Sequence, residues 1–77
     1  MNREAFWDEL SRNGISSTIV ALEPDIKDGY CIRKNRSCWE VFVQERGVAY
    51  DVIGFPSESN ALQYLLELLI DIYGKQS

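Results

Sequence analysis

Residues 30–73 read YCIRKNRSCWEVFVQERGVAYDVIGFPSESNALQYLLELLIDIY, and the order of the main structural elements follows from them. The first half of this stretch alternates apolar and polar residues with a period of two, which is typical of half-buried strands. The second half repeats near 3.6 residues, which indicates a helix. The change falls at Phe55-Pro56, because proline cannot continue the interior of a strand and Ser57 is a good helix cap.

The first half predicts an antiparallel sheet of three strands. The expected strands span residues 30–34, 38–44 and 48–53. A turn at Asn35-Arg36 joins the first two strands, and a turn at Arg46-Gly47 joins the last two, because glycine adopts a positive φ readily. This pairing places Ile32 opposite Trp39 on the face that carries the core.

The other face of this sheet is expected to be open to solvent. Continuing the register across the second turn pairs Val43 with Tyr50 and Val41 with Val52 on the core face, and Phe42 with Asp51 and Glu40 with Ile53 on the open face. A one-residue bulge at Gly47 would turn Asp51 inward, and the cost of burying a carboxylate argues against it. Cys31 and Cys38 would lie diagonally on the open face, about 7–8 Å apart by Cα, which is too far for an unstrained disulfide.

A first helix is predicted over residues 3–13. Asn2 can cap it, since a side-chain oxygen accepts a hydrogen bond from one of the first backbone N–H groups. Gly14 is expected to end the helix in a left-handed conformation. Phe6 and Leu10 lie four residues apart, so the helix has an apolar face.

The last helix, residues 58–73, is apolar over most of its circumference. Its polar stripe consists of Asn60, Gln63, Glu67 and Asp71. At roughly 100° per residue, the apolar arc covers about 240°. Either the sheet and the first helix together bury this arc, or part of it contacts a partner.

These elements predict an α+β fold of two layers, helix, three-stranded antiparallel sheet, helix, with both helices on one face of the sheet. Residues 1–77 are expected to form a single domain, because so short a chain builds one small core. Residues 16–29 are expected to form a surface connection with a short extended stretch at 18–22, and residues 75–77 to fray. The expected core consists of Phe6, Leu10, Ile32, Trp39, Val41, Val43, Val52, Leu65, Leu68, Leu69 and Ile72.

The charge and composition argue against several classes of function. The chain carries 8 basic and 12 acidic residues, a net charge of −4. Such a chain repels nucleic-acid phosphates and anionic membranes and attracts basic partners. The N-terminal segment MNREAFWDEL lacks the apolar stretch of a signal peptide, and Glu67 and Asp71 interrupt the apolar helix. We therefore expect a cytoplasmic protein with reduced thiols, without a membrane or nucleic-acid partner.

The sequence offers little for catalysis or for cofactor binding. It contains no histidine, which excludes catalytic triads, histidine bases and histidine-ligated metals. Cys31 and Cys38 lack the spacing and partners of a zinc site. Gly47 and Gly54 are too isolated to form a phosphate-binding loop. We expect a protein without catalytic activity, bound metal or cofactor.

The open face of the sheet is instead a candidate partner-binding site. Phe42 is expected to be exposed there among charged side chains, as an interface anchor would be. The alternatives are an incidental surface aromatic, or a sheet face covered by its own chain. The candidate contact residues are Arg33, Glu40, Phe42, Asp51 and Ile53. The rival site is the excess apolar arc of the last helix, around Leu62, Leu66 and Ile70.

The order helix, three strands, helix resembles the double-stranded RNA-binding domain in topology. That family carries a lysine-rich cluster at the start of its last helix, where this chain has Ser57-Glu58-Ser59-Asn60. Without basic residues there, the counterion release that drives RNA binding is missing. The resemblance therefore extends to the fold, and RNA binding is not expected.

A second resemblance rests on Trp39-Glu40-Val41-Phe42, Glu45-Arg46-Gly47, Phe55 with Ser57-Glu58, and Ala61 with Tyr64-Leu65-Leu66-Glu67-Leu68-Leu69. This pattern resembles small bacterial immunity proteins of polymorphic-toxin and contact-dependent growth inhibition systems. The resemblance implies a cytoplasmic protein that binds the C-terminal domain of one cognate toxin, often a basic nuclease, and occludes its active site. The alternative is a small non-catalytic interaction module, or a homodimeric subunit of another complex.

Overall fold

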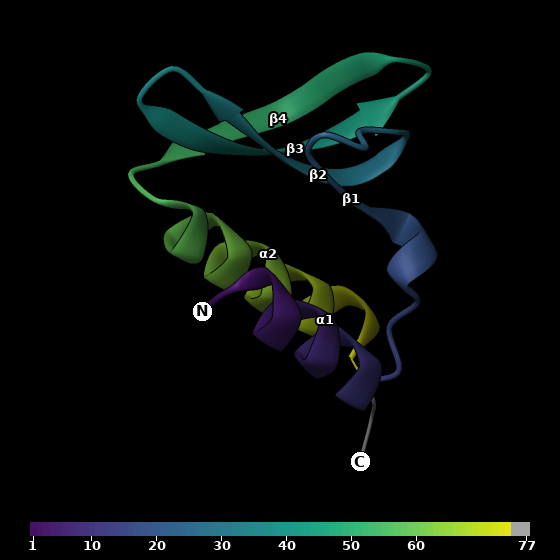
Figure 1. Cartoon of the computed structure of the whole chain (residues 1–77). Coiled ribbons are helices and arrows are strands. Elements are labelled where there is room, and N and C mark those ends of the chain that lie inside the picture. Colours follow the sequence, from purple (N-terminus) through teal and green to yellow (C-terminus); the bar gives the residue numbers. More distant parts are fainter. Residues whose placement is uncertain (75–77) are drawn as a thin grey trace.

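The computed structural model describes residues 1–74, and two helices pack on one face of a four-stranded sheet (Figure 1). The α+β class and the placement of both helices on one face are confirmed. The fraying predicted for residues 75–77 lies outside the described residues. The elements are α1 (Arg3–Arg12), the short 3-10 helix η1 (Ser17–Ile19), β1 (Val20–Leu22), β2 (Gly29–Asn35), β3 (Cys38–Glu45), β4 (Val48–Phe55) and α2 (Glu58–Tyr73).

The three expected antiparallel strands are present as β2, β3 and β4, but the expected sheet is incomplete, because β1 adds a fourth strand that runs parallel to β2. The strands lie in the order β1-β2-β3-β4, and Val20 pairs with Tyr30. All three residues of β1 are buried, so this strand has no apolar and polar alternation to reveal it. Since β1 is so short, residues 23–28 suffice to bring the chain back to the start of β2. The extra strand β1 is thus the difference between the observed and the expected topology.

Both helices begin at the predicted caps. The side chain of Asn2 accepts a hydrogen bond from the N–H of Ala5 at 2.8 Å, and the side chain of Ser57 accepts one from Asn60 at 3.1 Å. These bonds satisfy backbone donors that have no partner within the helix. They fix where each helix starts.

The pairing of β2 with β3 is shifted by two residues from the expected register. Ile32 lies opposite Val41 rather than Trp39, because a two-residue turn of Arg36 and Ser37 joins the strands. Arg36 takes the positive φ of 59° that this tight turn needs. A shift of two leaves each side chain on its expected face, since strands alternate with a period of two.

The pairing of β3 with β4 contains a bulge that the sequence does not reveal. Val43 pairs with Tyr50 as expected, so there is no bulge at Gly47. One pair further along the ladder, Val41 lies opposite Ile53, and the expected pairing with Val52 is wrong. Asp51 has a φ of 55°, and aspartate is one of the few residues besides glycine that adopts this conformation.

The bulge decides which side chains of β4 face the helices. In a regular ladder Val52 and Gly54 would lie on the helix face, whereas the bulge places Ile53 and Phe55 there. The ring of Phe55 packs against Tyr64 of α2 with 5.0 Å between centroids. The bulge therefore exchanges a glycine for an aromatic contact with α2.

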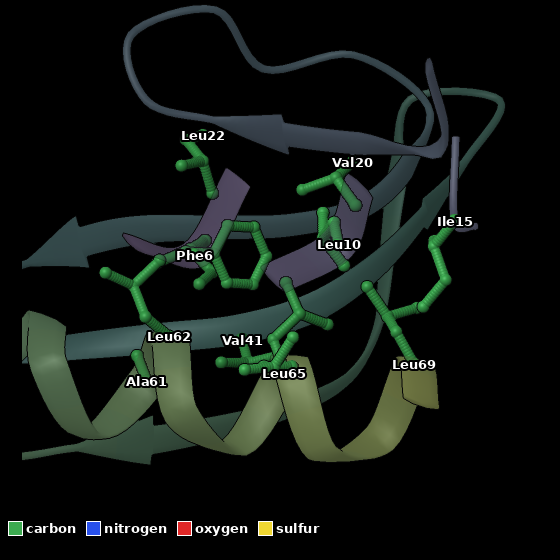
Figure 2. Packing of buried hydrophobic residues seen from close by; sticks show 12 residues of the cluster. Phe6, Leu10, Ile15, Val20, Leu22, Val41, Ala61, Leu62, Leu65 and Leu69 are labelled. Atoms are coloured by element: carbon green, nitrogen blue, oxygen red, sulfur yellow. The ribbon is translucent and has the colours of Figure 1, made fainter. Parts of the chain in front are cut away.

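The main core lies between the helices and the sheet, and Figure 2 shows Phe6 and Leu10 of α1 among side chains of β1 and α2. Of the expected core, the residues confirmed as buried are Phe6, Leu10, Ile32, Val41, Leu65 and Leu69. Those only partly buried are Trp39, Val43 and Leu68. Val52 and Ile72 are wrong, with 45% and 49% of their surface exposed. The additional buried residues of this cluster are Ile15, Val20, Leu22, Ala61, Leu62 and Leu66.

A second, smaller core lies on the opposite face of the sheet, which was expected to be open. Phe42 is 1% exposed there and packs with Ala21 and Cys31. Ile26, in the connection between β1 and β2, packs against the same cluster. This connection covers the face because it carries the chain back past the sheet to start β2.

The burial of Phe42 and the exposure of Val52 predict stability losses of very different size for substitutions at these two positions on neighbouring strands. Phe42→Ala is expected to lower the free energy of unfolding by about 3–5 kcal/mol, because it leaves a large cavity. Val52→Ala is expected to cost less than about 1 kcal/mol, because its side chain is nearly half exposed. Urea unfolding of both variants measures these changes. A larger loss for Val52→Ala than for Phe42→Ala would contradict the bulge and the burial of Phe42.

The turn between β3 and β4 is held by Asp28, which precedes β2. Its carboxylate accepts hydrogen bonds from the N–H groups of Arg46 at 3.0 Å and Gly47 at 3.2 Å, and from the side chain of Gln44 at 3.2 Å. The bond from Gly47, followed by those from Gln44 and Arg46, lowers the pKa of Asp28. The position of β4 therefore depends on a charge that lies outside the hairpin.

Asp28→Ala is expected to lower the thermal midpoint at neutral pH, with a dependence on pH of defined sign. Because the pKa of Asp28 is lower in the folded than in the unfolded chain, its stabilising effect is complete above the unfolded pKa of about 4. The effect is lost as the pH falls through the lower folded value. Melts of both proteins between neutral and strongly acidic pH should therefore converge, and a constant difference would contradict the assignment.

Candidate protein-binding surface

Three of the five predicted contact residues form a packed cluster instead of a free surface. Arg33 donates from Nε to Glu40 Oε1 at 2.9 Å, and its guanidinium lies 4.3 Å from the centroid of the Phe42 ring. The bond from Arg33, followed by one from Asn35, lowers the pKa of Glu40. The expectation of an exposed Phe42 is wrong, because its own chain covers it. It cannot anchor a partner without unfolding this face.

The cysteines belong to the same face and are both free thiols. The Cys31 thiol is buried and donates to the carbonyl oxygen of Lys27 at 3.1 Å. Burial raises its pKa, which keeps it in the less reactive protonated form. In the observed register Cys31 lies opposite Phe42, four residues along β3 from Cys38. The separation exceeds the expected one and is too long for a disulfide.

The other two predicted residues, Asp51 and Ile53, lie beside a different surface. The bulge places Ile53 opposite Val41, on the side of the sheet that faces the helices, so its expected position on the open face is wrong. Ile53 is nonetheless 40% exposed, because α2 does not cover this part of the sheet. Asp51 and Ile53 line one pocket together with residues of α2.

The course of α2 explains why this part of the sheet is uncovered. The helix starts next to Phe55 at the end of β4, where Tyr64 meets the Phe55 ring. It ends near β2, where the hydroxyl of Tyr73 lies 3.4 Å from that of Tyr30. Since Tyr30 is in register with Val43 and Val43 with Tyr50, α2 crosses the sheet diagonally and leaves the first half of β4 bare.

The resulting apolar surface is called the β4–α2 strip. It consists of Val48, Tyr50 and Ile53 of β4 with Tyr64, Leu68 and Ile72 of α2. Between the two elements lies an open pocket of about 480 Å³, floored by Val41 and Val43 of β3 and Tyr30 of β2. Asp51 is the one charged residue among those that line it.

Acidic side chains border the strip on both sides. Asp51 lies on the β4 side and is exposed. On α2, Glu67 and Asp71 are exposed and lie three residues after Tyr64 and Leu68, so each is a neighbour of the strip on the helix surface. Glu67 accepts a hydrogen bond from Gln63 at 2.7 Å. An apolar floor between acidic borders fits an apolar segment that carries positive charge.

The rival site predicted on α2 is wrong, because the three residues named for it are not exposed. Leu62 and Leu66 are buried in the main core, and Ile70 is partly buried against it. The first of the two explanations for the wide apolar arc is therefore largely correct. The part of α2 that remains exposed is the Tyr64, Leu68 and Ile72 row, which adjoins β4.

The strip was missed in the sequence because the face of Ile53 depends on the bulge, and the exposure of Val48 and Tyr50 depends on the diagonal course of α2. A signal existed for the α2 side of the strip, since the apolar arc of α2 is too wide for one packing partner. The apolar residues of β4 are a further signal: they occur on both faces of the strand, so some of them cannot be buried by the helices. Neither pattern indicates that the exposed apolar residues of β4 and of α2 lie next to each other.

Residues 1–74 contain no group of three or more histidine, cysteine, aspartate or glutamate side chains that could hold a metal ion. None of the helices described there has the length and hydropathy required to span a bilayer.

Comparison with known proteins gives no relative: no family model matches the chain, and neither the curated proteins nor the solved structures contain a significant match.

Proposed function

We propose that this chain is a non-catalytic immunity protein of the cytoplasm. In this proposal it binds the C-terminal domain of a cognate bacterial toxin through the β4–α2 strip and occludes the toxin's active site. The toxin domain is basic, as a nuclease that binds a polyanionic substrate must be. The resemblance of the last three-fifths of the chain to small immunity proteins suggests the biological role, and the surface supports the mode of action.

The distribution of exposed apolar residues carries the proposal. Within residues 1–74, all the large apolar side chains classed as exposed lie on β4 or in the last turn of α2. Four of them belong to the strip, namely Val48, Tyr50, Ile53 and Ile72; the other two are Val52, on the other face of β4, and Tyr73, at the end of α2. Exposed apolar side chains that gather in one place mark an interaction site, whereas scattered ones do not. A chain this small leaves little apolar surface to spare.

The charges support a basic partner. The net charge is −4, and Asp51, Glu67 and Asp71 border the strip. Opposite charges at the edge of an interface speed association and select the partner, while buried apolar contacts slow dissociation. An immunity protein needs both properties, because it must reach the toxin before the toxin reaches its substrate.

The proposal is tested with the toxin domain encoded next to the gene for this chain. Expression of that domain alone should arrest growth of a host cell, and co-expression of this chain should restore it. The two purified proteins should form a complex in which the toxin is inactive. Unaltered toxicity on co-expression would refute the immunity function. A chain that is a dimer by sedimentation and does not bind the toxin would favour the alternative, a homodimeric subunit.

Two adjacent residues of β4 test which face binds. Ile53→Glu is expected to weaken the complex by about 2 kcal/mol, or about 30-fold, because it places a charge in the strip. Val52→Glu is the matched control, because Val52 has similar exposure but lies on the other face of β4. Calorimetry measures the affinities, and thermal melts show whether each variant is folded. Equal effects at both positions would contradict the assignment.

If Ile53→Glu fails to fold, Ile72→Glu provides the same test from α2. Ile72 is about half exposed at the end of the helix, so the fold tolerates a charge there. It should weaken the complex to a similar extent, and a tight complex with this variant would contradict the use of the strip.

Asp51→Asn separates charge from backbone conformation. Asparagine also adopts a positive φ readily, so the bulge should persist. Removing the charge is expected to slow association with the basic toxin domain and to weaken its dependence on salt, with a smaller effect on dissociation. Stopped-flow measurements at low and high salt provide the rates. An association rate equal to that of the unaltered chain at low salt would contradict the role of Asp51.

A further inference from the structure

The two edges of the sheet differ in how well the chain covers them. At one edge, β1 is only three residues long, and Arg3 of α1 donates to the backbone carbonyl of Glu23 directly after it at 2.7 Å. At the other edge, β4 is eight residues long, and among the described strands it pairs only with β3 (Figure 1). A long edge presents unpaired N–H and C=O groups to any further strand.

The turn between β3 and β4 identifies which backbone groups point outward. Arg46 and Gly47 both have positive φ, 52° and 79°, as in a two-residue hairpin turn in which Glu45 and Val48 exchange both hydrogen bonds. Hydrogen-bonded and non-hydrogen-bonded pairs alternate along an antiparallel ladder. The N–H and C=O of Ala49 therefore point away from β3.

Beyond the bulge, the direction of the backbone groups follows from the turn between β2 and β3. Asn35 and Cys38 form the pair next to this turn, so the even-numbered residues of β3 direct their backbone groups at β2. Odd-numbered residues of β3 direct their backbone groups at β4, so Val41 and Trp39 bond to their partners Ile53 and Phe55. Gly54, between these two partners, has its N–H and C=O directed outward. The free edge thus carries one open pairing site on each side of the bulge.

We propose that the toxin domain adds a fifth strand to the sheet by pairing an extended segment with the free edge of β4. This inference rests on the proposed function and specifies how the strip is used. Alternate side chains of the added strand would be apolar and would pack beside Tyr50 and Ile53. Lysine or arginine in the same segment would lie near Asp51.

The charges favour a basic partner over a second copy of this chain. Antiparallel pairing of two β4 edges about a twofold axis at the middle of the strand would set each Asp51 opposite Val52 of the other copy and bring the two carboxylates close together across the new interface. Like charges that meet across a strand pair repel each other. The bulge also interrupts the edge, which hinders pairing between identical chains. A basic segment meets the same carboxylate with opposite charge.

Amide hydrogen exchange, measured by NMR on the complex with the adjacent-gene toxin domain, tests the inference directly. In the isolated chain the N–H groups of Ala49 and Gly54 are unpaired and should exchange fast. In the complex both should slow by at least about 10-fold, as hydrogen-bonded amides do. Ser37, in the distant turn, is the control and should not change.

The outcomes separate this inference from the proposed function. If the toxin domain binds and is neutralised while Ala49 and Gly54 still exchange fast, the added strand is refuted and the immunity function stands. If the isolated chain is a dimer in sedimentation and already protects both amides, a second copy occupies the edge and the inference is refuted.

A synthetic peptide tests the edge without the toxin. A short peptide of alternating lysine and valine should slow exchange at Ala49 and Gly54 when added in excess. The same peptide with glutamate in place of lysine should do so much less, because Asp51 repels it. If the toxin domain does not bind, the immunity function fails, and the absence of protection by the lysine peptide then refutes the inference as well.

Proline at Ala49 or Gly54 removes the outward-facing backbone N–H and leaves the hydrogen bonds between β4 and β3 intact. Ala49→Pro is expected to weaken toxin binding about 10-fold, the effect of losing one hydrogen bond. Ala49→Ser, which keeps the N–H and a small side chain, is the control. Gly54→Pro gives the same test should Ala49→Pro melt early. If the folded proline variants bind within about 2-fold of the unaltered chain, the added strand is refuted.

Discussion

The arrangement of this protein depends on one backbone constraint, the bulge of β4 at Asp51. Because Asp51 takes a positive φ, the strand gains one residue relative to β3, and each later side chain changes face. Phe55 then reaches α2, and Ile53 turns to the helix side. Without the bulge, Gly54 would face α2 in place of Phe55, and Tyr64 would lose its aromatic contact. The same residue thus joins the hairpin to the helix and shapes the exposed strip.

The two faces of the sheet are covered by different means, and this leaves the apolar β4–α2 strip exposed. The helices cover one face, but α2 crosses it diagonally from Phe55 to Tyr30. The connection after β1 covers the other face, where Ile26 packs with the cluster around Phe42. The corner formed by the first half of β4 and the end of α2 receives neither cover. In a chain of 77 residues this is where exposed apolar surface is concentrated, and the proposed function assigns it to a partner.

The electrostatics of the chain follow the same division. Arg33 is paired with Glu40 and lies over the ring of Phe42, so both charges serve the fold. Asp28 holds the turn that precedes β4. The acidic residues that border the β4–α2 strip are exposed, and Asp51 among them is held by the bulge at the edge of the pocket. Charge and apolar area are thus combined at one place on the surface, as recognition of a basic protein requires.

The sequence by itself determined the α+β class, both helices with their caps, three of the four strands and half of the buried residues of the main core, since these follow from local periodicity and capping chemistry. Only the tertiary structure decided β1, the cover over Phe42, and the face on which Ile53 lies. A three-residue strand is too short to show a period, and the burial of Phe42 depends on a connection whose path is set by distant packing. The bulge at Asp51 is stabilised by the contact of Phe55 with α2, and the pattern of apolar and polar residues in β4 does not reveal that contact.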